Sequence, residues 1–95
     1  MLKVNCDKKG IDKAIQSINQ GGIVVFPTDT VYGIGCDPFN KESVKKIYQI
    51  KSRDFSKPFP VLVYSKEVAK KIAVFDEFTE KVVEKFWPGP LTIIL

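Results

Sequence analysis

The hydrophobic positions of this chain change their spacing several times, and each change predicts an element. Between residues 10 and 19 apolar residues return every three or four positions, which predicts a helix. The unbroken apolar run of residues 23–26 then predicts a strand buried on both faces, and Pro27 ends it because proline cannot donate to a ladder. After a polar corner, a second strand is predicted through Cys36.

Three further helices are predicted by residues that can cap them. Asn40, Ser65 and Asp76 each precede apolar residues at helical spacing, and their side chains can accept a hydrogen bond from a first-turn amide. Each helix should therefore begin directly after its capping residue. The residues expected to face the core are Val44, Ile47 and Tyr48, then Val68, Ala69 and Ile72, and then Phe78, Val82, Val83 and Phe86.

Short apolar segments at residues 2–5, 61–64 and 91–95 predict additional strands. Strands that alternate with helices indicate an α/β or α+β protein, here a twisted mixed sheet flanked by helices. The 95 residues suffice for a single domain, residues 1–95. Because the last apolar segment runs to Leu95, we expect the chain to be the N-terminal portion of a longer, truncated domain.

The charged residues, the lack of histidine and the two cysteines limit the kinds of site that this chain can form. The formal net charge is +4, which favours anionic partners, and of the 15 basic residues only Arg53 is an arginine. Histidine is absent, which excludes triads built on histidine and removes a common metal ligand. Cys6 and Cys36 lack the spacing of a zinc site or disulfide framework, so we expect two reduced, packed thiols.

The sequence shows no apolar run long enough to cross a membrane and no visible signal peptide. We therefore expect no membrane partner and a cytoplasmic location.

The polar corner between the first two predicted strands carries two hydroxyls and a carboxylate, from Thr28, Asp29 and Thr30. Short polar side chains in a corner commonly bond turn amides, and that structural role is one interpretation. The alternative is a small-molecule site, because Gly33 and Gly35 in the next strand indicate a bulge or the close approach of a ligand or backbone.

A second group of candidate residues follows the helix that Asn40 is expected to cap. Lys51 and Arg53 lie at its carboxyl end, before a loop that Pro58 and Pro60 stiffen. The guanidinium group of Arg53 offers a planar fork for phosphate or carboxylate, whereas a lysine is a mobile point charge. A cation at a helix carboxyl end can also serve the helix alone, which leaves a structural role open for Lys51.

Four motifs stand in order along the chain: PTDTVYG at residues 27–33, KSR at 51–53, KPFPVLV at 57–63 and WPGPLT at 87–92. Together they resemble the YrdC-like family over residues 11–95, and the best understood members of that family are threonylcarbamoyl-AMP synthases. The resemblance implies a twisted α/β fold around a basic cavity. It also implies condensation of L-threonine, bicarbonate and ATP into threonylcarbamoyl-AMP with release of pyrophosphate, in the pathway of tRNA threonylcarbamoyladenosine modification.

The resemblance assigns substrate-binding roles to residues at matching positions. Thr30 falls where the family contacts threonine, and Thr28 and Tyr32 are expected beside that pocket. Leu62 stands where certain members have a histidine near threonine, so this chain departs from the pattern there.

The resemblance also implies a catalytic and ATP-binding group. Lys51 and Arg53 match the family's KxR pair, which grips the carboxylate and phosphates, and Lys57 falls at a position that some members use for ATP. The family's second nucleotide-binding motif should lie beyond Leu95, so we expect the 95-residue chain alone to be inactive.

A displacement at phosphorus asks the protein for alignment and positive charge, and it requires no protein nucleophile. Magnesium is expected to arrive with ATP, since the chain shows no dedicated metal site. Further expected partners are L-threonine, bicarbonate and downstream tRNA-modification proteins. Two alternatives stay open: an RNA-binding YrdC-like module with weak RNA binding, and an inactive fragment of a longer protein.

Overall fold

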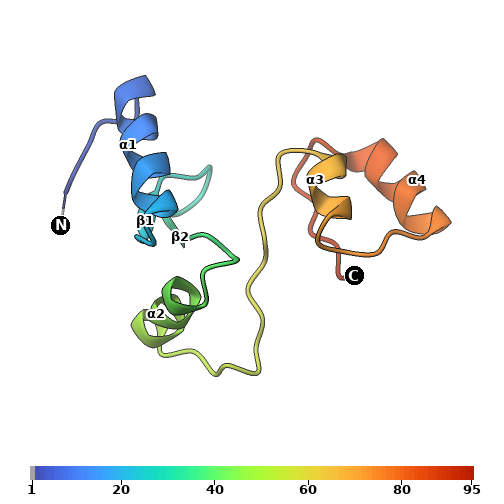
Figure 1. Cartoon of the computed structure of the whole chain (residues 1–95). Coiled ribbons are helices and arrows are strands. Elements are labelled where there is room, and N and C mark those ends of the chain that lie inside the picture. The colour runs from blue at the N-terminus through green and yellow to red at the C-terminus, as the bar shows by residue number, and fades with distance from the viewer. Residues whose placement is uncertain (1) are drawn as a thin grey trace. The chain divides into compact units, whose positions relative to one another are not determined.

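The structure, a computed structural model, describes residues 2–95, and these residues form two compact units that divide after Pro58 (Figure 1). The elements of the first unit are α1 (Lys8–Asn19), β1 (Val24–Phe26), β2 (Gly33–Gly35) and α2 (Lys41–Lys51). Those of the second unit are α3 (Lys66–Lys70) and α4 (Glu77–Phe86).

Each helix of the described chain begins after a side chain that accepts a hydrogen bond from the amide three positions later. Asn40, Ser65 and Asp76 cap α2, α3 and α4, which confirms the predicted starts. The first helix begins at Lys8, two residues earlier than predicted, because Asp7 caps it and accepts from Gly10 N at 2.9 Å. Local capping chemistry therefore sets where the helices begin.

The sheet of residues 2–95 consists of β1 and β2, which pair antiparallel with Val24 opposite Gly35 and Phe26 opposite Gly33. This arrangement confirms the α+β class, but the predicted mixed sheet is reduced to two strands. Val25 is 57% exposed, so the prediction that β1 is buried on both faces is wrong. A sheet of two strands has too little neighbouring structure to cover both of its faces, so an apolar run in it stays partly exposed.

The glycines of β2 make room for a side chain of β1. A Cβ atom on Gly33 would lie 2.8 Å from the ring of Phe26, and one on Gly35 would lie 3.2 Å from the same ring. The close approach that these glycines predicted is therefore made by Phe26, within the sheet itself.

Three predicted strands, at residues 2–5, 61–64 and 91–95, do not form within the described chain. A strand is stabilised by the ladder to its neighbour, and in residues 2–95 the only ladder is that between β1 and β2. An apolar pattern shows that a segment is suited to pairing but does not supply the partner.

The core of the first unit joins α2 to the turn that follows α1. Ser43 is 1% exposed, and its hydroxyl donates to Gly21 O at 2.7 Å. Gly21 has a φ of +86°, in the left-handed region that favours glycine. Ile47 and Tyr48 are also buried, as the helical pattern predicted. This contact fixes the start of the helix that leads to the KSR motif.

The second unit places Ala69 of α3 and Val83 of α4 in its core, with 5% and 2% of each residue exposed. Phe78 is 74% exposed and Phe86 is 52% exposed, so the prediction that they face the core is wrong. The reason is that α3 has only 5 residues and offers little surface for α4 to pack against.

Ion pairs add to the packing of the second unit. Lys66 Nζ lies 3.2 Å from Glu80 Oε2, and Lys70 also pairs with Glu80. The hydrogen bond that Lys70 donates to Glu80 is the main cause that lowers the pKa of Glu80. The hydrogen bond that Lys66 donates to the same carboxylate is the main cause that raises the pKa of Lys66. After α4, the Trp87–Pro88 peptide bond is cis.

Candidate functional site

The polar corner connects β1 to β2 and is exposed. Thr28 Oγ1 donates to Val31 O and accepts from Thr30 N at 3.3 Å. These two bonds give Thr28 a part in shaping the corner, and its place beside a substrate pocket stays a prediction. The side chain of Thr30 is exposed and forms none of the hydrogen bonds found among residues 2–95, and Tyr32 is 75% exposed. The corner therefore presents Thr30 and Tyr32 outward, and their role in binding substrate stays a prediction.

The KSR loop, residues 51–58, leaves the carboxyl end of α2 in a tight turn. Ser52 adopts the left-handed conformation with a φ of 51°, and its amide donates to Gln49 O at 3.2 Å. Arg53 N then donates to Tyr48 O at 3.0 Å, which closes the last turn of the helix. Lys51 is the last residue of α2, where a cation is favoured by the helix dipole.

The guanidinium group of Arg53 is turned toward the backbone of its own loop. Its Nε lies 3.4 Å from Lys57 O, and its Nη2 lies 3.2 Å from Pro58 O. The sequence predicted a fork directed at an anion, and in this structure two donors of that fork bond backbone carbonyls instead. Arg53 thus shapes the loop, and the anion contact stays a prediction.

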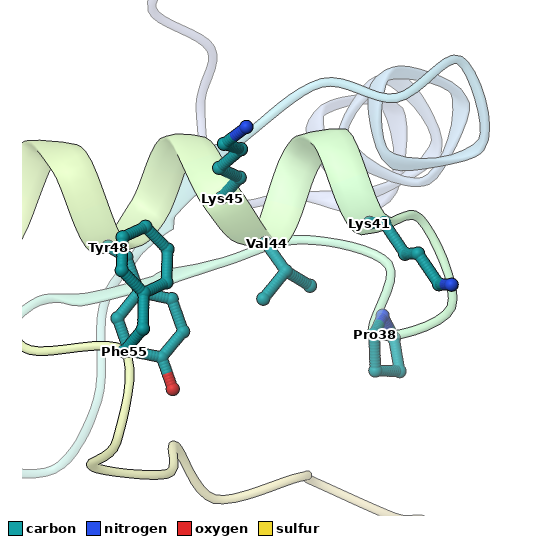
Figure 2. Close-up of a pocket in the computed structure, with 6 residues that line it drawn as sticks. All are labelled: Pro38, Lys41, Val44, Lys45, Tyr48 and Phe55. Carbon is teal, nitrogen blue, oxygen red and sulfur yellow. The ribbon is translucent and has the colours of Figure 1, made fainter.

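A shallow groove of about 280 Å³ runs along α2 and ends at the KSR loop (Figure 2). Figure 2 shows the rings of Tyr48 and Phe55 against each other at one end of the groove and Pro38 with Lys41 at the other. The two rings stack with centroids 4.9 Å apart. The sequence predicted that Tyr48 faces inward, but it carried no signal that Phe55 would be its partner. None of the six predicted site residues lines this groove.

The KSR loop carries a surplus of positive charge. Lys51, Arg53 and Lys57 supply three cations, and Asp54 supplies one carboxylate. Asp54 Oδ1 accepts from Ser56 N at 2.9 Å, and hydrogen bonds from Ser56 lower the pKa of that carboxyl group. Asp54 is therefore ionised at neutral pH and serves the turn, while the cations remain in excess.

The thiol of Cys36 is not an activated nucleophile. Burial raises the pKa of Cys36, and the negative charge of Asp37 raises it further, so this thiol is protonated at neutral pH. Both Cys6 and Cys36 are free. Cys6 is exposed, so the prediction that it is packed is wrong, because it lies in the bend before α1.

The structure gathers the predicted site residues into two groups. Lys51, Arg53 and Lys57 share the KSR loop, whereas Thr28 and its neighbours share the corner. Figure 1 shows the corner between β1 and β2, and the KSR loop after α2. The two groups therefore belong to separate segments of the first unit.

Among residues 2–95 there is no group of three or more His, Cys, Asp or Glu side chains that could bind a metal ion. In the same residues, no helix has the length and apolar character needed to cross a membrane.

Comparison with known proteins identifies the family. The profile of the Sua5/YciO/YrdC family, which is described as telomere recombination, matches residues 16–95. The chain therefore belongs to this family, and the resemblance drawn from its four motifs is confirmed.

Individual relatives are similar over most of this chain. A putative threonylcarbamoyl-AMP synthase of Methanocaldococcus jannaschii is 42% identical over 93% of the chain, and the match covers 42% of that relative. A threonylcarbamoyl-AMP synthase of Coxiella burnetii is 38% identical over 88% of the chain and 46% of its own length. The chain thus spans less than half the length of these relatives.

A solved structure has the same fold. The crystal structure of Pyrococcus abyssi Sua5 complexed with L-threonine superposes with a TM-score of 0.80 and is 32% identical. The similarity covers 90% of this chain and 26% of that one. The fold of this chain is therefore that of one part of the Sua5 protein.

Proposed function

We propose that this chain provides the threonine-binding and phosphate-binding part of a cytoplasmic L-threonylcarbamoyl-AMP synthase, an ATP-dependent nucleotidyltransferase of tRNA modification. The observation that carries the proposal is the family match over residues 16–95, which includes the corner and the KSR loop. The relatives named threonylcarbamoyl-AMP synthase and the threonine complex of Sua5 support it.

The proposed reaction has two bond-forming steps. The neutral amine of threonine attacks the carbon of bicarbonate, and loss of water gives a carbamate anion. A carbamate oxygen then attacks the α-phosphorus of ATP, and pyrophosphate leaves with the electrons of the broken P–O bond. Both reactants of the second step are anions, so the protein has to offset their repulsion and align them.

The KSR loop has the charge that this step needs. Lys51, Arg53 and Lys57 would lie against the phosphates and the threonine carboxylate, where cations stabilise charge that moves onto the leaving pyrophosphate. Magnesium would be carried by the ATP phosphates and water, as is common for this ion. The substrate hydroxyl of threonine would meet Thr30 in the corner, with Tyr32 beside it.

The chain matches only 42% of the length of the Methanocaldococcus jannaschii relative. We therefore test the function in a fusion that joins this chain to the part of that relative that has no counterpart in it. The measurement is pyrophosphate release with magnesium. We expect release only when L-threonine, bicarbonate and ATP are all present, and release that does not depend on threonine would contradict the proposal.

Two controls keep the result clear. The fusion with both Lys51→Ala and Arg53→Ala should fold and release no pyrophosphate, since it lacks two of the loop's cations. The 95-residue chain alone, titrated with L-threonine and with ATP, shows how much of the binding it provides without the added part.

A further inference from the structure

Tyr48 holds the KSR loop at several points, although it is not among the predicted site residues. Its hydroxyl donates to Lys57 O at 2.7 Å, and its backbone carbonyl accepts from Arg53 N at 3.0 Å. Its ring stacks on Phe55 at an interplanar angle of 29° (Figure 2). The residue is buried, with 8% exposed. Three residues of the KSR loop, Arg53, Phe55 and Lys57, thus contact the same tyrosine.

The carbonyl of Lys57 connects Tyr48 to Arg53. This oxygen accepts from the Tyr48 hydroxyl and also from Arg53 Nε, and a carbonyl oxygen has two lone pairs for two such bonds. The tyrosine bond, at 2.7 Å, has the length of a well-formed O–H···O bond. The arginine bond, at 3.4 Å, is long and weak, so it cannot hold the carbonyl by itself.

We infer that Tyr48 is a positioning residue of the synthase site: it fixes the Lys57 carbonyl. It thereby fixes the loop backbone at Lys57 and Pro58, whose two carbonyls accept from the Arg53 guanidinium group. The inference rests on the proposed function only in that Arg53 is taken to bind the anionic substrate. A buried, packed tyrosine suits this role because its ring and hydroxyl are both restrained, so the carbonyl has little freedom to rotate.

The test uses the 95-residue chain and the variant Tyr48→Phe, which keeps the ring stacked on Phe55 and removes only the hydroxyl. Tyr64→Phe is the matched control, because it makes the same chemical change at a tyrosine that is 91% exposed in the second unit. Ser43→Ala is the stability control, since it removes a buried hydroxyl of α2 whose bond runs to Gly21 and not to the KSR loop.

Two readouts separate positioning from stability. Arg53 is the single arginine, so its Nε–H group gives one arginine side-chain signal in a ¹⁵N NMR spectrum. The second readout is the affinity for ATP with magnesium and for pyrophosphate. In Tyr48→Phe we expect the Arg53 signal to shift and to exchange faster with solvent, and both affinities to fall about threefold to tenfold.

Ser43→Ala and Tyr64→Phe should leave the Arg53 signal and both affinities unchanged, even where Ser43→Ala lowers the unfolding midpoint as much as Tyr48→Phe does. If Tyr48→Phe does not fold, Phe55→Leu replaces it, and the loss of stacking should shift the same signal. An unchanged Arg53 signal in a folded variant overturns the inference, and so does an equal loss of affinity in Ser43→Ala.

Failure of the proposed function has a different signature. If the unchanged fusion neither binds ATP nor releases pyrophosphate, the proposed function is wrong, and the Arg53 signal alone decides whether Tyr48 directs that side chain.

Discussion

Replacement of Arg53 by lysine keeps the charge of the KSR loop and removes the planar fork. The two side-chain bonds of Arg53 to the loop, to Lys57 O at 3.4 Å and to Pro58 O at 3.2 Å, are exposed and long. Each therefore contributes at the low end of the usual range, about 0.5 kcal/mol. Loss of both amounts to about 1 kcal/mol, or roughly a fivefold smaller population of the ordered loop.

Arg53→Lys should also remove hydrogen bonds to a bound anion. A lysine ammonium group cannot make two parallel hydrogen bonds to a phosphate or carboxylate, and a hydrogen bond to a charged group contributes about 1.5–3 kcal/mol. Loss of one such bond lowers affinity by about tenfold or more. We therefore expect Arg53→Lys to weaken binding of ATP and pyrophosphate by at least about tenfold.

The assay is isothermal titration calorimetry with both anions at two ionic strengths. Lys81→Arg, an equally charge-preserving change at an exposed position of α4, is the control and should bind as the parent does. Because net charge is the same in all three proteins, the salt dependence should also be the same. Equal affinity in Arg53→Lys and the parent would refute the reasoning, since the fork would then have no part in binding.

Three further predictions concern the corner, the core and the ion pairs. Thr30→Val in the fusion should reduce threonine-dependent pyrophosphate release about tenfold or more, because a buried hydroxyl of the substrate would lose its partner. Full activity with unchanged selectivity against serine would show that Thr30 has a structural role and does not bind threonine. Ser43→Ala should lower the free energy of unfolding by about 1–3 kcal/mol in urea titrations, since Gly21 O loses a buried donor, and an unchanged midpoint would contradict this. The pKa of Glu80 lies below its ordinary value of 4.5, so its ion pairs stabilise the fold above that pH and are lost as pH falls through the lowered pKa. Glu80→Gln should therefore make the free energy of unfolding fall less steeply as the pH is lowered. An unchanged acid-side dependence would show that the ion pairs of Glu80 contribute nothing to it.

For α2, α3 and α4, the sequence by itself determined where the helix begins. Asn40, Ser65 and Asp76 cap α2, α3 and α4 as predicted, because a cap bonds an amide only three positions away and needs no distant partner. The four motifs could likewise be recognised from the sequence without a structure, and they led to the correct family.

Strands and exposure depended on the tertiary structure. The apolar segments at residues 61–64 and 91–95 have the composition of strands and form none in the described chain, because a ladder needs a neighbour. Phe78 lies on an apolar helical face and is still exposed, since burial depends on what packs against that face.

The candidate site divides in the same way. The uniqueness of Arg53 among the basic residues is a fact of sequence, and it drew attention to the KSR loop. Only the tertiary structure decided that the guanidinium group bonds Lys57 O and Pro58 O, and that Tyr48 holds the same carbonyl from α2. The physical reason is that a side chain's hydrogen bonds depend on where the backbone of a loop turns, and that turn is set by contacts between residues such as Tyr48 and Phe55.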